Sequence, residues 1–105
     1  MYTRNVSMKL KANSATEFTR TLENEVIPML RKQKGFRDEI TLLAAERNEV
    51  VAISFWDRKE DAESYNREKY PEILKTLSKV VEGTPRVESF EVANSTSHQI
   101  AAKAA

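Results

Sequence analysis

The sequence contains no cysteine, only two glycines and a single histidine, His98, among its 105 residues. Without cysteine the chain can form neither disulfides nor thiolate nucleophiles nor thiolate-bound metal sites. So few glycines nearly exclude a phosphate-binding glycine loop, and the sequence has neither a zinc-ligand spacing nor a nucleophile elbow. These absences predict no metal site.

Long apolar runs are also missing. No stretch approaches the roughly 20 apolar residues that span a bilayer, and the N-terminus has no apolar signal segment. The 17 basic and 16 acidic side chains leave a net charge of +1, which implies no nucleic-acid partner unless the basic residues form a stripe. We therefore expect a cytoplasmic protein with neither a membrane nor a nucleic-acid partner.

The first third of the chain reads as a strand followed by a helix. Residues 2–12 alternate between apolar and polar side chains, which predicts a strand. Ser14 and Glu17 have the spacing of a capping box, which predicts a helix that begins there. This helix is expected to kink at Pro28, which has no N–H to donate, and to end at Gly35.

The middle of the chain reads as a hairpin. Residues 36–47 and 49–57 are both extended in pattern, and Asn48 between them is a plausible turn residue. Both strands carry apolar side chains on both faces, whereas an antiparallel sheet with one solvated face should alternate. Something must therefore cover each side of this hairpin.

The last third reads as a second helical region and a fourth strand. Asp57 is predicted to cap a helix that Pro71 kinks or restarts and that runs to Gly83. Residues 84–93 alternate again and predict a strand. Residues 95–105 have little to bury and are predicted to form a flexible tail, so one domain spans residues 1–94.

This order predicts an α+β fold of the ferredoxin-like βαββαβ type, with a four-stranded antiparallel sheet and both helices on one face. The other face would then expose apolar side chains of the hairpin, for which we expect Leu43, Val51, Ile53 and Phe55. Soluble monomers rarely expose an apolar patch of more than a few hundred Å². We therefore expect a homodimer that pairs through the sheet.

Three segments give the chain a resemblance to a known family. They are the kinked helix and its exit, residues 26–36; the strand that ends in Trp56 and runs directly into a helix, residues 56–62; and Tyr65-Asn-Arg-Glu-Lys-Tyr70. In this order and spacing they resemble the antibiotic biosynthesis monooxygenase (ABM) superfamily. The resemblance covers roughly residues 3–93 and implies a dimeric α+β barrel.

The resemblance also implies an activity and a site. Better known members oxidise quinol-like aromatic substrates with molecular oxygen and need neither metal nor flavin, so no cofactor is expected. The pocket of such proteins lies between the sheet and the helices. The residues that this implies here are Asn5, Tyr65 and Tyr70 as catalytic residues and Trp56, Phe18 and Leu74 as substrate-binding residues.

The chain departs from the family at two places. Tyr65 and Tyr70 stand where many members have histidines, and tyrosine, with an unperturbed pKa of about 10, is a poor base but a good hydrogen-bond donor. Lys75 falls where the haem-degrading branch has its iron-binding histidine, and protonated lysine cannot ligate iron. These departures disfavour haem degradation.

Two functions therefore stay open. The first is a cofactor-independent monooxygenase in which Asn5 and a tyrosine hydroxyl stabilise oxyanion charge. The second is a non-catalytic dimeric module that binds a small ligand. Four of the proposed site residues also have a structural interpretation: Asn5 as a surface polar residue, Trp56 as a packing anchor, and the two tyrosines as core residues with satisfied hydroxyls.

Overall fold

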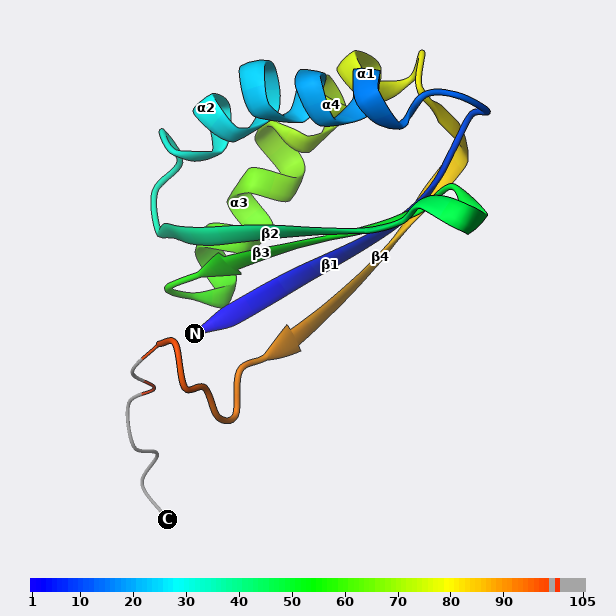
Figure 1. Ribbon diagram of the computed structural model, residues 1–105. Helices are drawn as coiled ribbons and strands as arrows, with labels where there is room; N and C mark the ends of the chain where they lie inside the picture. Colours follow the sequence, from blue (N-terminus) through cyan, green and yellow to red (C-terminus); the bar gives the residue numbers. More distant parts are fainter. Residues whose placement is uncertain (99, 101–105) are drawn as a thin grey trace.

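The computed structural model of the chain describes residues 1–98 and residue 100 and contains one four-stranded antiparallel sheet (Figure 1). Its strands are β1 Tyr2–Leu10, β2 Phe36–Ala44, β3 Glu49–Trp56 and β4 Val81–Glu91, in the order β2-β3-β1-β4. This arrangement confirms the predicted α+β class. The tail predicted over residues 95–105 lies partly outside the described residues.

The helices all lie on one face of the sheet, as predicted (Figure 1). They are α1 Ala15–Thr21, a π-helical segment Leu22–Val26, α2 Ile27–Leu30, α3 Lys59–Glu68 and α4 Tyr70–Leu77, and a short 3₁₀ turn, Ala45–Arg47, joins β2 to β3. Within the described part of the chain, no helix is long and apolar enough to cross a membrane.

The predicted kink at Pro28 takes the form of the π-helical segment that precedes it. The Ile27 N–H donates to the carbonyl of Leu22, five residues earlier. Pro28 has no N–H for the carbonyl of Asn24, and its ring would clash with that carbonyl in a regular α-helix. The wider π turn relieves this conflict, and π turns often mark functional sites.

One predicted helix cap lacks its hydrogen bond, and the other is wrong in position. Ser14 is the N-cap residue of α1, as predicted, but its side chain makes no capping hydrogen bond, and its hydroxyl lies 3.4 Å from the carbonyl oxygen of Ala12. Asp57 does not cap α3 either, because Arg58 occupies the N-cap and the Asp57 carboxylate pairs with Arg37. Each of these two side chains therefore interacts with a nearby polar group and not with the free N–H groups at the start of its helix.

Both glycines lie outside the helices, Gly35 in a turn and Gly83 in a strand, which corrects two predicted helix ends. The helix predicted to end at Gly35 ends at Leu30, and Gly35, with φ of +79°, lies in the turn that leads into β2. Gly83, with φ of +70°, lies in β4, which begins at Val81 rather than at residue 84. The pairing of β4 with β1 shifts register around Gly83, as in a bulge.

Gly35→Ala is expected to destabilise the fold more than Gly83→Ala. A Cβ at position 35 would lie 2.7 Å from the Cβ of Asp61, whereas one at position 83 would meet no heavy atom within 4 Å. Both positions share the left-handed penalty of about 1–2 kcal/mol. Urea denaturation should therefore show a loss larger by about 1 kcal/mol or more for Gly35→Ala. Equal losses would rule out the Asp61 contact as the cause.

The sheet has one buried face and one open face. Alternation along β1 puts Arg4, Val6, Met8 and Leu10 under the helices, all buried. The cross-strand pairs place six apolar side chains on the other side, which we call the open-face patch: Ile40, Leu42, Val51, Ile53, Phe55 and Phe90.

The open-face patch confirms most of the predicted apolar face and corrects one residue. Leu43 lies on the helix side of β2, beside the Thr16 and Arg20 side chains of α1, and Leu42 takes its place on the open face. Leu42 is 52% exposed. The His98 ring stacks on Phe55 at 5.2 Å between centroids, so a described part of the tail covers one end of the patch.

Candidate active site

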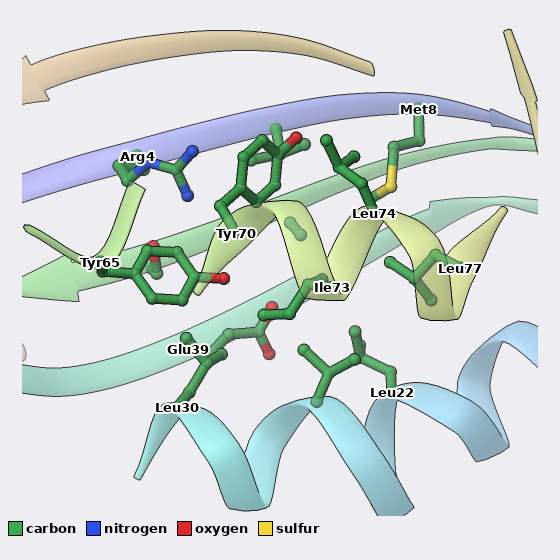
Figure 2. Close-up of a pocket in the computed structure, with 14 residues that line it drawn as sticks. Arg4, Met8, Leu22, Leu30, Glu39, Tyr65, Tyr70, Ile73, Leu74 and Leu77 are labelled. Carbon is green, nitrogen blue, oxygen red and sulfur yellow. The ribbon is translucent and has the colours of Figure 1, made fainter. Parts of the chain in front are cut away.

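A small cavity lies between the helix side of the sheet and the helices, with a volume of about 40 Å³ (Figure 2). The sheet contributes Arg4, Val6, Met8, Glu39, Ala52 and Ser54, and the helices contribute Leu22, Val26, Leu30, Tyr65, Tyr70, Ile73, Leu74 and Leu77. Most of this lining is apolar, and its polar groups are few. Such a combination is typical of sites for small organic ligands.

The size of the cavity limits what enters it without movement. A cavity that holds benzene has a volume of about 150 Å³ in an engineered apolar core, and one water needs about 10–15 Å³. An aromatic ligand would therefore require the wall of the cavity to move outward. The π-helical segment, which supplies Leu22 and Val26, is the irregular part of this wall.

Three polar side chains form a row across the floor of the cavity. Ser54 of β3 pairs with Glu39 of β2 on one side and with Arg4 of β1 on the other. Directly paired residues point to the same face, and neighbouring strands lie about 4.8 Å apart. A carboxylate, a hydroxyl and a guanidinium therefore follow one another over roughly 10 Å.

Arg4 carries a buried positive charge at one end of this row. It is 3% exposed, and its Nη2 donates to Oδ1 of Asn66 at 2.8 Å. Its guanidinium carbon lies 4.4 Å from the ring centroid of Tyr70 and 5.1 Å from that of Tyr65. Burial lowers the pKa of Arg4, although arginine stays protonated in proteins. No ion pair with a carboxylate compensates this charge in the described structure.

Glu39 is the acidic group at the other end. Its carboxylate is half-buried, and the Thr41 hydroxyl donates to Oε2 at 2.7 Å. Burial raises the pKa of Glu39, and the hydrogen bond from Thr41 opposes this shift. The result is a carboxylate that is a better base than an exposed glutamate and that has one oxygen held in place.

The two tyrosines remain neutral hydrogen-bond donors at neutral pH. Burial raises the pKa of Tyr65 and, to a smaller extent, that of Tyr70, although Arg4 opposes both shifts. The Tyr70 hydroxyl oxygen is buried and has no hydrogen-bond partner within the described residues. Burial of a hydroxyl without a hydrogen-bond partner costs about 1–3 kcal/mol of stability. A hydrogen bond from Tyr70 to an acceptor atom of a ligand would recover this energy.

The structure brings together only some of the residues that the sequence indicated. Tyr65, Tyr70 and Leu74 line the cavity (Figure 2). Trp56 lies one layer behind it: its indole N–H donates to Oγ of Ser54 at 2.8 Å, and its ring packs on Tyr65 at 5.0 Å. Phe18 is buried in the core, 1% exposed, and does not line the cavity.

Asn5 lies on the opposite side of the sheet. It pairs with Ile53 and Glu88, and strand alternation turns its side chain to the open face. Its Oδ1 is buried without a hydrogen-bond partner in the described part of the chain. Asn5 therefore does not reach the cavity, and Arg4, one residue earlier, takes the position under the helices.

Sequence reasoning missed the polar row of Arg4, Glu39 and Ser54. A signal for Arg4 was present, since the alternation of Val6, Met8 and Leu10 continues back to position 4 and puts a charged residue at an inward position. Glu39 has the same signal on β2, where it shares a face with Thr41. Charged residues at inward positions of a strand are rare enough to indicate a site.

Comparison with known proteins gives a family match. The model of the antibiotic biosynthesis monooxygenase family matches residues 1–71. A search of curated proteins gave no match.

Solved structures share the fold at low sequence identity. A monooxygenase from Streptomyces coelicolor in complex with nanaomycin D is 13% identical, has a TM-score of 0.75 and aligns over 90% of this chain and 88% of its own. SnoaB, a cofactor-independent oxygenase from Streptomyces nogalater, is 14% identical, with a TM-score of 0.74 and coverages of 92% and 97%. A Nitrosomonas europaea protein of unknown function is equally similar, with 10% identity, a TM-score of 0.74 and coverages of 90% and 91%.

Proposed function

The chain belongs to the antibiotic biosynthesis monooxygenase family, and we propose that it oxidises a small aromatic, quinol- or phenol-like substrate with molecular oxygen and without a metal or flavin. The observation that carries this proposal is the apolar cavity with a single polar row, which ends in the buried guanidinium of Arg4 beside two tyrosines. Its similarity to the cofactor-independent oxygenase SnoaB supports the absence of a cofactor from the reaction.

The chemistry balances without an external reductant. In an anthrone-type substrate, a methylene group loses two hydrogens and gains one oxygen atom as a carbonyl, while the second oxygen atom leaves as water. The substrate itself supplies the electrons once it has lost a proton. The residues of the chain must therefore hold the aromatic ring, stabilise the substrate anion and exclude bulk water.

Arg4 and Tyr70 would stabilise that anion. The Arg4 charge lacks a carboxylate partner in the described structure, and the buried Tyr70 hydroxyl lacks a hydrogen-bond partner there. Tyr65 and Leu74 would pack on the ring. Trp56 would act from behind, because it fixes both Ser54 and Tyr65.

Oxygen consumption with a panel of quinols and anthrone-type phenols tests the activity. Tyr70→Phe is expected to lower kcat/KM by about 100-fold, since it removes one hydrogen-bond donor to developing negative charge. Tyr2→Phe is the matched control, because Tyr2 is half-buried on the same face but does not line the cavity. Equal activity of both variants would exclude Tyr70 from the reaction.

A non-catalytic binding module is the second candidate. The observation in its favour is that burial raises the pKa of Tyr65 and of Tyr70, so that neither can serve as a base near neutrality. Saturable binding of an aromatic probe without oxygen uptake on any substrate of the panel would support this candidate and contradict the oxygenase.

The second part of the proposal is a homodimer through the open-face patch. Ile40, Leu42 and Phe90 are each about half exposed, and they lie on one continuous sheet surface with Ile53. Burial of such a surface contributes about 25 cal/mol per Å². A second copy of the chain would supply the matching apolar face, as a two-fold axis brings identical patches together.

A further inference from the structure

We infer that the cavity selects weakly acidic aromatic hydroxyl compounds and ionises them on binding, with Glu39 as the proton acceptor and Arg4 as the partner of the resulting phenolate. This inference rests on the proposed function and names the proton acceptor of that site. It concerns the bound state alone and can be tested without oxygen.

The position of Glu39 supports its role as proton acceptor. It is the one carboxylate that lines the cavity among the described residues. The Thr41 hydroxyl holds Oε2, which leaves Oε1 to take the proton. Besides Asp38, which precedes it in β2, its titratable surroundings are Tyr65 of α3 and the Arg4 and Tyr70 side chains of the same cavity.

The polar row brings the proton acceptor Glu39 and the cation Arg4 within reach of one oxygen atom of a ligand. Ser54 lies between Glu39 and Arg4, so an oxygen above Ser54 lies roughly 5 Å along the row from the strand on either side. The Ser54 hydroxyl accepts from the Trp56 indole and retains its own hydrogen for another acceptor. The guanidinium of Arg4 and the carboxylate of Glu39 would approach this oxygen from opposite ends of the row.

The proton transfer conserves charge inside the cavity. The O–H bond of the ligand breaks, its electron pair stays on oxygen, and the proton forms a new O–H bond with the Glu39 carboxylate. Before transfer the site holds one guanidinium and one carboxylate; afterwards it holds one guanidinium and one phenolate. The phenolate lies closer to the positive charge of Arg4, and a low-dielectric surrounding strengthens that attraction.

A neutral ligand and a carboxylate ligand would fit this row less well. A neutral hydrocarbon would leave the charge of Arg4 without an anion beside it and the Tyr70 hydroxyl without a hydrogen-bond acceptor. A permanently charged carboxylate would face Glu39 across the row and would repel it. A hydroxyl compound that can give its proton to Glu39 avoids both costs.

Calorimetry and absorption spectroscopy with 4-nitrophenol test the inference under nitrogen. The ionised form of this probe absorbs at longer wavelength than the neutral form, so the spectrum reports its bound state. At a pH well below the pKa of the free probe, we expect wild-type protein to bind it as the phenolate. Titrations in buffers of different ionisation enthalpy should show no net proton release, because Glu39 keeps the proton.

Glu39→Gln should change the proton count and keep the phenolate spectrum. An amide cannot accept the proton, so close to one proton per bound probe should then appear in the buffer. Glu72→Gln, an exposed glutamate of α4, should behave as wild type.

The wild-type measurement decides the matter even if Glu39→Gln fails to fold. A bound probe that stays neutral would overturn the inference, and so would a phenolate whose proton is fully released by wild-type protein. Absence of oxygen uptake together with a phenolate spectrum and a retained proton would instead contradict the oxygenase and uphold this inference.

Discussion

Leu42→Lys is expected to convert the dimer into a monomer, whereas Leu43→Lys should leave it intact. The two leucines are neighbours on β2 and have similar exposure, 52% and 46%. Alternation puts Leu42 in the open-face patch and Leu43 on the helix side. The pair therefore separates the open face from general effects of an added lysine on this edge strand.

The expected increase in the dissociation constant of the dimer follows from the symmetry of the interface. In a two-fold dimer each substitution occurs twice, so two ammonium groups would lose water against an apolar surface. If each costs about 1.5–2 kcal/mol, the dissociation constant rises by at least 100-fold. Static light scattering at micromolar concentration should give the mass of two chains for wild type and Leu43→Lys, and of one chain for Leu42→Lys.

The same variant tests whether the site is complete within one chain. The residues that line the cavity come from the helix side of the sheet and from the helices, on the face opposite the open-face patch. Monomeric Leu42→Lys should therefore still bind 4-nitrophenol with an affinity within a few-fold of wild type. Wild-type protein that scatters as one chain and stays soluble would contradict the dimer.

The fold was predictable because its signals are local and mutually consistent. Alternation in β1 and β4, helical stripes between them and the order of the elements together allow few topologies. The boundary between α4 and β4 was not predictable in this way. Val80 and Val81 continue the apolar stripe of the helix, but Val81 pairs with Leu10 of β1, and this long-range contact ends the helix at Leu77.

The site was predictable only where it lies on helices. Tyr65, Tyr70 and Leu74, which the family resemblance implied, lie on α3 and α4, where an error of one residue turns a side chain by about 100°. On a strand, an error of one residue reverses the face, and this is the difference between Asn5 and Arg4. Charged side chains are mostly exposed to solvent, so the residue types of Arg4 and Glu39 argued against placing them in a buried site.

Arg4→Met is expected to abolish most binding of the phenolate and to change stability little. The substitution keeps an unbranched side chain of similar length and removes the charge. It gives up the stacking on Tyr65 and Tyr70 and the hydrogen bond to Asn66. Those losses, about 1–3 kcal/mol together, are offset because no charge has to be desolvated any longer. The free energy of unfolding should stay within about 1–2 kcal/mol of wild type.

Binding should respond far more strongly, because the phenolate then has no cation beside it. Loss of one partner of a buried charge pair costs about 2–5 kcal/mol, so the affinity for 4-nitrophenol should fall by at least about 30-fold and the bound probe should become neutral. Asn66→Ala is the control: it removes the hydrogen-bond acceptor of Arg4 but keeps the charge, and should alter affinity only a few-fold.

The two measurements separate a ligand-binding role of Arg4 from a structural one. If Arg4 served mainly to fasten α3 to β1, Arg4→Met and Asn66→Ala would both lower the free energy of unfolding and would leave the affinity of the folded protein unchanged. A buried guanidinium that only fastens a helix has no reason to share a cavity with a buried, unpartnered tyrosine hydroxyl. Urea denaturation and the spectrum of the bound probe, on the same three proteins, therefore decide between them.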